Sequence, residues 1–234
     1  MKINRPESNF LEELTPPTAT KSLFVTPENL MKKDLRTTGV ITPLRSQVPC
    51  NSCTSHGFSA LIESYYLSTM AIEIELAAGW MHTCLAQAHC HGGVSLRGLA
   101  ELLPGQILPI ASQGNYPWKP SQCNITGKYA VPALMQVLRP EQIRTAILSG
   151  YPVVTGMWAH DDFLVWPGGV TYTSSNKNGS FQHVVCLVGF DDYGGCWIAK
   201  NSYSSDWGDN GYVSIAYDHC GIGHIYHAYT VVPA

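Results

Sequence analysis

Between positions 53 and 70 the chain carries apolar side chains every three or four residues, at Phe58, Leu61, Ile62, Tyr65 and Met70. This spacing places them on one face of a helix. Asn51 or Ser52, directly in front, is of a type that caps helix starts. The pattern predicts a buried helix with Cys53 in its first turn. Weaker helical patterns follow at residues 96–103 and 141–148.

After residue 150 the pattern changes to short runs rich in Val, Ile and aromatic residues, separated by turn residues such as Asn178-Gly179. These runs predict strands at residues 151–157, 169–173, 183–189, 196–200, 212–216 and 228–232. Helices followed by strands are typical of an α+β fold with a helical lobe and a sheet lobe. Ligand sites commonly lie between two such lobes.

The first part of the chain has a different character. Residues 1 to about 27 are polar and are interrupted by Pro16-Pro17 and Pro27. This predicts an N-terminal extension at residues 1–30 in front of a globular domain at residues 31–234. Because residues 23–25 and 30–31 form apolar patches that a solvated linker would not need, we expect the extension to pack on the domain. The alternative is a segment that covers the ligand site.

Composition narrows the function classes. Of the 234 residues, 45% are hydrophobic and only 13% are charged, against about 25% charged in ordinary soluble domains. A disordered or coiled-coil protein is excluded. The net charge is −3 and no basic run is present, so we expect no nucleic-acid partner. No window approaches eighteen uninterrupted apolar residues, so we expect no membrane span and no membrane partner.

Cysteine usage bears on the compartment. Eight cysteines are many for a reducing cytosol. They predict a secreted, periplasmic or lysosome-like oxidising compartment. The opening residues lack the apolar stretch of a secretory signal, so the export route is not visible in the chain.

Cys53 is the first candidate for chemistry. A cysteine in the first turn of a helix feels the positive end of the helix dipole, which favours the reactive thiolate. Taken alone, the Cys50-Asn51-Ser52-Cys53 pattern fits a redox pair, half a zinc site, a nucleophile beside a structural disulfide, or an inert pair.

The surrounding sequence resembles the papain-like cysteine protease family, as a divergent member. The resemblance starts at residues 34–53, which lead through Val-Ile-Thr-Pro to Gln47 and two cysteines, and it runs on to Glu63. Further matches are Cys-His-Gly-Gly at 90–93, Tyr-Pro at 116–117, Asp-Phe at 162–163, Gly-Gly at 168–169, Gln-His-Val at 182–184, Lys-Asn-Ser-Tyr at 200–203, Trp-Gly-Asp-Asn-Gly-Tyr at 207–212 and Cys-Gly at 220–221.

The resemblance implies a papain-like two-lobe fold, with a left lobe at about 46–130, a right lobe at about 131–234 plus 31–45, and a cleft between them. It also implies a catalytic set. Cys53 would be the nucleophile, His183 the base, Asn201 the group that orients the base, and Gln47 an oxyanion donor together with the Cys53 N–H. His183 and Asn201 follow Cys53 by 130 and 148 residues, within the family's 130–150. Trp207 would cover the His–Asn hydrogen bond.

Three departures change packing but remove no reacting group. Asn51 stands where the family has glycine, Thr54 where it has an aromatic residue, and Tyr203 where it has the first tryptophan of its Asn-Ser-Trp block. A fourth residue, His56, lies three positions after Cys53. We interpret His56 as structural, because a helical neighbour of the nucleophile cannot easily also contact an orienting amide.

Disulfides compete with zinc for the cysteines. Cys84, Cys90, His89 and His91 lie close in sequence and have ligand-forming side chains. By resemblance, however, Cys50 pairs with Cys90 and Cys84 with Cys123. Cys196 with Cys220 is a candidate third bridge, and Cys186 is expected to be a buried free thiol. We therefore predict no metal site and no cofactor.

The expected activity is endopeptidase cleavage through a thioester acyl-enzyme. By resemblance, the substrate backbone lies along Gly92-Gly93, and the pocket for the second residue before the cleaved bond is walled by Val94, Ser95, Ala133, Val184 and Ile225. These residues are small or apolar, so we expect an apolar side chain there. The alternatives are an acyltransferase or amide-forming enzyme at the same site, and an inactive binding homologue. The expected partners are a peptide or protein substrate and a proteinaceous inhibitor, and the chain is expected to be a monomer.

Overall fold

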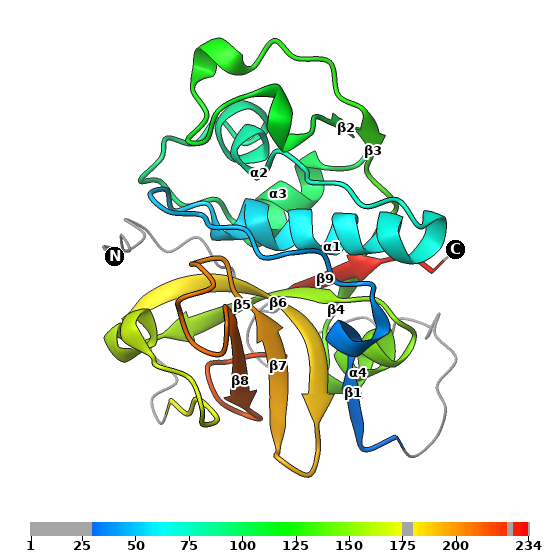
Figure 1. The fold of residues 1–234 in the computed structure, drawn as a ribbon, viewed down its shortest axis with the longest axis vertical. Helices are drawn as coiled ribbons and strands as arrows, with labels where there is room; N and C mark the ends of the chain where they lie inside the picture. The colour runs from blue at the N-terminus through cyan, green and yellow to red at the C-terminus, as the bar shows by residue number, and fades with distance from the viewer. Residues whose placement is uncertain (1–29, 175–179, 224–226, 234) are drawn as a thin grey trace.

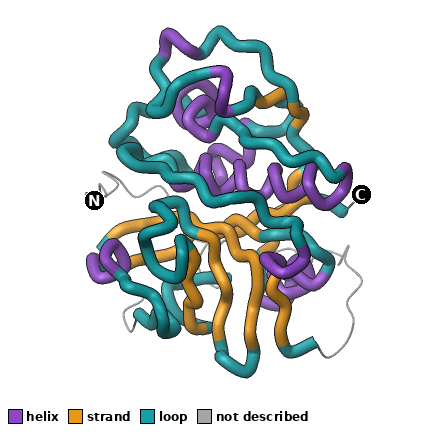
Figure 2. Tube along the Cα trace, in the orientation of Figure 1, coloured by secondary structure: helices purple, strands orange, loops and turns teal. Residues whose placement is uncertain are grey.

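The computed structural model describes residues 30–174, 180–223 and 227–233. Figures 1 and 2 show two lobes. The upper one holds helices α1 (Cys53–Met70), α2 (Ala78–Trp80) and α3 (Leu96–Leu102) with the small β2–β3 sheet (Ile107–Leu108 and Tyr129–Ala130). The lower one holds the large sheet and α4 (Pro140–Leu148). The predicted α+β organisation is confirmed. The predicted N-terminal extension lies outside the described residues, apart from Leu30.

The large sheet is antiparallel. Among the described residues it contains β1 (Lys32–Asp34), β4 (Leu134–Val137), β5 (Val153–Ala159), β6 (Phe181–Asp191), β7 (Cys196–Lys200), β8 (Tyr212–Ala216) and β9 (Ala228–Val231). Their order is β4-β9-β5-β6-β7-β8, with β1 paired to β6. Buried on all but its last residue, β6 lies in the middle of the sheet and carries His183.

Helix α1 begins and ends where the apolar spacing predicted, and α3 and α4 match their predictions within one residue. The predicted strand at residues 169–173 is wrong. Only Tyr172 makes a bridge there, to Ile215. Gly168 and Gly169 have φ of 85° and 83°, in the left-handed region that a strand excludes. Short 3₁₀ turns occupy Leu35–Thr38, Ala111–Gln113, Pro120–Gln122 and Asp161–Val165, and a π-helical turn follows α2 at Met81–Leu85.

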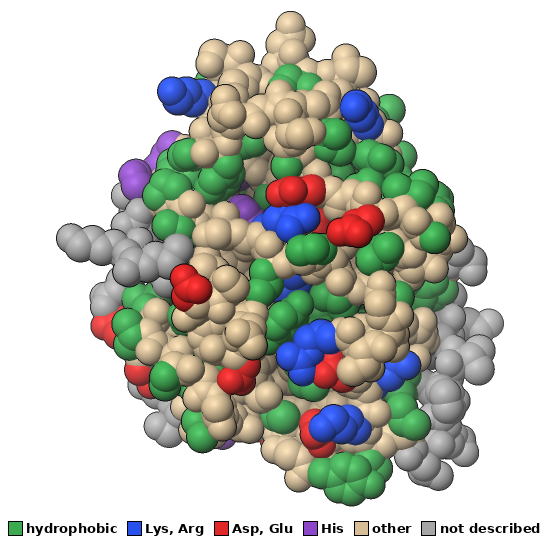
Figure 3. Space-filling model, viewed as in Figure 1, with side chains coloured by type: hydrophobic (Ala, Val, Ile, Leu, Met, Phe, Trp, Pro, Cys, Tyr) green, Lys and Arg blue, Asp and Glu red, His purple; other side chains and the backbone are tan. Residues whose placement is uncertain are grey.

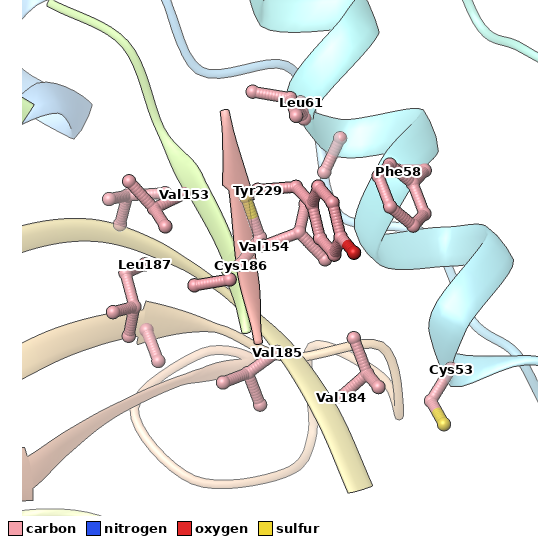
Figure 4. Packing of buried hydrophobic residues seen from close by; sticks show 14 of the residues in the cluster. Cys53, Phe58, Leu61, Val153, Val154, Val184, Val185, Cys186, Leu187 and Tyr229 are labelled. Atoms are coloured by element: carbon pink, nitrogen blue, oxygen red, sulfur yellow. The ribbon is translucent and has the colours of Figure 1, made fainter. Parts of the chain in front are cut away.

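Helix α1 lies against the large sheet. Figure 4 shows Phe58 and Leu61 on the helix side of a core whose sheet side includes Val154 and Val184. Gly57 lets the helix and the sheet approach each other closely. A methyl group at this glycine would lie 2.9 Å from a Val154 methyl and 3.1 Å from a Val184 methyl. The absence of a side chain at position 57 therefore sets the spacing between α1 and the strand that carries His183.

Two disulfides staple the helical lobe. Cys50 is bonded to Cys90 and Cys84 to Cys123, as the resemblance implied. Cys186 is a buried free cysteine, also as expected.

The third expected bridge, between Cys196 and Cys220, is wrong because both thiols are free. Cys196 pairs with Asp191 at the last residue of β6. The Cys220 carbonyl accepts from Trp158, which pairs with Gln182 near the first residue of β6. The Cys196 thiol instead lies beside Ser214 of β8 and Thr171.

The surface is sparsely charged. On the face that Figure 3 shows, acidic and basic side chains are interspersed and form no stripe of one sign. Within the described residues, no helix is both long and apolar enough to cross a membrane.

Candidate active site

Cys53 is the first residue of α1, with Ser52 as its N-cap. Its side chain is buried, and the Val184 backbone lies near the thiol and favours its ionised form. Figure 4 shows Cys53 at the start of the helix and Val184 on the neighbouring sheet side. Since Val184 follows His183 directly, this contact brings the thiol beside the strand that carries the candidate base.

His183 and Asn201 form the second part of the site. The Nε2 atom of His183 lies 2.7 Å from Oδ1 of Asn201. That oxygen also accepts the backbone N–H of Ser202 at 2.8 Å. An amide oxygen can only accept, so Nε2 of the imidazole carries the hydrogen. In the neutral ring, Nδ1 is therefore the basic atom.

Burial opposes the charge on each reacting group. It raises the pKa of the Cys53 thiol to about 11. It also lowers the pKa of His183 to about 4, while the hydrogen bond to Asn201 acts in the opposite direction. A lone thiolate or a lone imidazolium is thus costly here.

Aromatic rings enclose the imidazole. Tyr203 lies against His183 with 4.9 Å between ring centroids and 35° between planes, and Phe163 lies at 5.8 Å. Trp207, expected to cover the His–Asn bond, packs instead on Tyr203 at 5.4 Å and on Phe163 at 4.9 Å. Its indole N–H donates to the Phe163 carbonyl at 2.9 Å. The ring next to the imidazole therefore belongs to Tyr203, and Trp207 supports it from behind.

Gln47 is held on several sides. Its backbone N–H donates to the Ser202 carbonyl at 2.7 Å, and its Oε1 accepts from the Ser202 hydroxyl at 2.6 Å. Its Nε2 donates to the Cys50 carbonyl at 3.1 Å. One amide hydrogen of Gln47 is thus engaged, which leaves the second one for another acceptor.

The segment expected to bind the substrate backbone is tied to the start of α1. The Thr54 hydroxyl donates to the Val94 carbonyl at 2.7 Å, and the Asn51 side chain donates to the His91 carbonyl at 2.7 Å. Gly92 and Gly93 lie between these two anchors, and Ser95 caps α3. Two of the residues that depart from the family pattern therefore position this segment.

The expected pocket residues are only partly brought together. Val94 and Val184 both lie near the first turn of α1, the former through Thr54 and the latter through Cys53. Ile225 lies outside the described residues.

The assignment of Ala133 to this pocket is wrong. Its carbonyl accepts from Val232, and it precedes β4, three strand positions from β6. At about 4.8 Å per strand this is roughly 14 Å. The residue opposite Val184 is Gly156 on β5. Sequence reasoning missed Gly156 because the register of β5 against β6 is set by the sheet and not by any local pattern.

A pocket of about 150 Å³ lies between the lobes, with Val184, Asn201, Ser202 and His56 in its wall. Its lining contains neither Cys53 nor His183. It therefore lies behind the candidate reacting groups. Within the described residues, no three His, Cys, Asp or Glu side chains gather in a metal-binding group.

Comparison with known proteins identifies the family. Residues 30–230 match the model of the "Papain family cysteine protease" family, so the chain belongs to the papain family of cysteine proteases. It is 30% identical over 190 residues to "Peptidase 1" of Psoroptes ovis, covering 76% of this chain and 58% of that protein. It is 28% identical over 207 residues to "Cathepsin J" of Mus musculus, covering 81% and 62%. The chain thus spans less than two thirds of the length of these relatives.

Solved structures agree on the fold. The Carica candamarcensis cysteine protease CMS1MS2, in complex with E-64, superposes with a TM-score of 0.73 at 20% identity, covering 86% of this chain and 98% of that one. The bromelain protease from Ananas comosus, in complex with the E64 inhibitor, gives 0.70 at 23% identity, covering 88% and 100%. The expected papain-like fold is confirmed.

Proposed function

We propose that the chain is a cysteine endopeptidase that hydrolyses peptide bonds through Cys53, His183 and Asn201. The observation that carries this proposal is the hydrogen bond between Nε2 of His183 and Oδ1 of Asn201. Val184, which follows His183 in β6, lies near the Cys53 thiol. The hydrogen bond leaves Nδ1 as the basic atom of a ring fixed in one tautomer. Membership of the papain family supports the same assignment.

In the first half of the reaction, Nδ1 of His183 takes the proton of Cys53, and the sulfur attacks the substrate carbonyl carbon. The second amide hydrogen of Gln47 and the backbone N–H of Cys53 donate to the oxyanion that forms. His183 then gives its proton to the leaving amine, and a thioester remains on Cys53. In the second half, His183 takes a proton from water, which hydrolyses the thioester. Asn201 keeps the ring in place throughout.

For the substrate, we propose an apolar side chain at the second residue before the cleaved bond. Val94 and Val184 offer methyl groups there, and burying an unpaired guanidinium against them is costly. Ser95 and Ile225 complete the proposed wall, and Gly92-Gly93 binds the substrate backbone. A library profile with Leu, Val or Phe ahead of Arg at that position supports this pocket, whereas Arg ahead of Leu overturns it.

The main test is hydrolysis of a fluorogenic peptide with Leu at that position, using Cys53→Ala as the control. We expect turnover in the wild type and less than about one thousandth of it in the variant. Mass analysis of the products with an added amine separates hydrolysis from acyl transfer, because a transferase yields the amide instead of the acid. Failure of an epoxide inhibitor to alkylate Cys53 would indicate an inactive binding homologue.

The remaining proposals concern the setting. The two disulfides fit a secreted, periplasmic or lysosome-like oxidising compartment. The proposed partners are peptide or protein substrates and a proteinaceous inhibitor that occupies the same cleft, with the chain acting as a monomer. No cofactor is needed for this chemistry.

A further inference from the structure

His56 is a buried titratable residue that the reaction does not use. It lies one helical turn after Cys53 in α1 and is 8% exposed. Its ring meets the ring of Tyr116 edge-on, with 5.7 Å between centroids and 89° between planes. Burial lowers the pKa of His56 to about 4, so the ring is neutral at neutral pH.

The polar atoms of the ring face backbone groups. Nδ1 lies 3.0 Å from the Ser52 carbonyl and 3.2 Å from the Ser52 hydroxyl. The Ser46 backbone lies near the ring and favours its protonated form. His56 therefore holds Ser52, the N-cap of α1 that precedes Cys53.

Tyr116 links Ser52 to Gln47. Its hydroxyl donates to the Gln47 carbonyl and lies 2.9 Å from the Ser52 hydroxyl. Because the single Tyr116 hydrogen goes to Gln47, the Ser52 hydroxyl must donate to Tyr116. His56 Nδ1–H then donates to the Ser52 carbonyl. The helix start and the Gln47 loop are thus joined by one continuous set of hydrogen bonds.

The opposite side of Gln47 is held by Ser202, through the backbone bond at 2.7 Å and the side-chain bond at 2.6 Å. Ser202 neighbours Asn201 and therefore belongs to the sheet lobe. Without His56, Gln47 would remain fixed to the sheet lobe but would be less firmly fixed to Cys53. The two oxyanion donors, Gln47 Nε2 and the Cys53 N–H, come from these two segments.

We propose that His56 is a positioning residue that sets the Gln47 amide relative to the Cys53 N–H and so aligns the two halves of the oxyanion site. This rests on the proposed function. A ring that only filled space would be replaced by phenylalanine without loss. A ring that positions Gln47 would not, because phenylalanine has no polar atom to bond Ser52.

The experiment compares His56→Phe and His56→Gln with the wild type in two reactions at Cys53. Hydrolysis of the Leu peptide passes through an oxyanion, whereas alkylation by iodoacetamide displaces iodide and forms none. For His56→Phe we expect kcat to fall about tenfold to a hundredfold, since small misplacements of catalytic groups cost up to about 10². We expect KM and the alkylation rate to stay within about twofold. His56→Gln keeps an N–H donor and should recover part of the lost kcat.

The matched control is His82→Phe. His82 is also buried, and it bonds the His89 carbonyl at 3.0 Å instead of the Gln47 loop. The His82→Phe variant should be less stable than the wild type but should not show the selective loss of kcat. Equal kcat in His56→Phe and the wild type would overturn the proposal, as would a parallel fall of turnover and alkylation.

A second measurement separates this proposal from the proposed function. The Cys53 sulfur adds to the carbonyl carbon of a peptide aldehyde, and the thiol proton moves to the former carbonyl oxygen. Binding of the aldehyde therefore probes the oxyanion site without turnover. We expect its Kd to weaken about tenfold in His56→Phe. If the wild type binds the aldehyde but does not hydrolyse peptides, the endopeptidase assignment fails while the role of His56 is still decided. An unchanged aldehyde Kd in His56→Phe overturns the positioning role.

Discussion

The ring of Tyr203 lies against the imidazole of His183, with 4.9 Å between centroids, and it is completely enclosed by the surrounding protein. This contact excludes water from one face of the imidazole beside the His183–Asn201 hydrogen bond. A hydrogen bond shielded in this way is stronger than one exposed to solvent. The residue that protects the bond is thus one at which the chain departs from its family.

Replacing Tyr203 by Ala should therefore cost both stability and activity. Truncating a buried aromatic ring costs about 3–5 kcal/mol, and water entering the space would compete for the His183–Asn201 bond. Tyr203→Phe keeps the ring and should retain most of the activity. Urea unfolding and peptide hydrolysis check the two variants, and equal kcat for Ala and Phe would contradict the shielding role.

His183→Ala and Asn201→Ala should differ in degree. Loss of the base should lower kcat by about 10³-fold or more, since acid–base catalysis contributes up to about 10⁴. Loss of Asn201 should cost only about tenfold to a hundredfold, because Tyr203 and Phe163 still pack on the ring. Steady-state kinetics on folded variants measure this. Equal losses would contradict the division into a base and an orienting group.

Stability should fall in mild acid through His56. Its pKa is near 6.5 in the unfolded chain and about 4 in the folded one, so unfolding takes up a proton between these values. The stabilisation is complete above about pH 6.5 and is lost as the pH falls toward about 4. Between pH 7 and pH 5 the wild type should lose about 2 kcal/mol more than His56→Phe. Parallel pH profiles in urea unfolding would show that His56 is already protonated in the folded chain.

The two disulfides offer a matched comparison. Their sequence separations are 40 and 39 residues, so removing either should cost a similar amount, about 4 kcal/mol by loop-closure entropy. Only Cys50–Cys90 lies beside the site, because Asn51 N–H donates to the Cys90 carbonyl at 2.7 Å. Replacing Cys50 and Cys90 by Ala should raise KM for the Leu peptide several-fold, whereas replacing Cys84 and Cys123 should leave it unchanged. Melting temperatures provide the control for stability.

Local patterns predicted the elements well where burial follows periodicity. The spacing from Phe58 to Met70 defines α1 because one helix face packs on the sheet, and runs rich in Val and Ile mark β5 through β9. Residues 169–173 failed because the preceding glycine backbone, with φ near 85° at Gly168, turns the chain away from a strand. Side-chain composition alone does not report that conformation.

The candidate site was recognised from the order of its motifs along the sequence. The assignments that failed were those that depend on which residues lie close together in the folded chain. Cys196 and Cys220 are cysteines of suitable type, but both are free, and the Cys196 thiol lies beside Ser214 and Thr171 instead. Ala133 was placed beside Val184, where the sheet register instead has Gly156. His56 was interpreted only as structural, because its bond to Ser52, which continues through Tyr116 to Gln47, joins segments whose proximity the sequence does not display.

Gly57 allows the close approach of helix α1 to the large sheet. Helix α1 carries the sulfur and β6 carries the imidazole, so the closeness of the reacting pair depends on how deeply the helix settles against Val154 and Val184. One added methyl group at Gly57 would move Cys53, the proposed nucleophile, away from His183, the proposed base, although neither residue is changed. The distance between the Cys53 sulfur and β6 therefore depends on a residue that has no side chain.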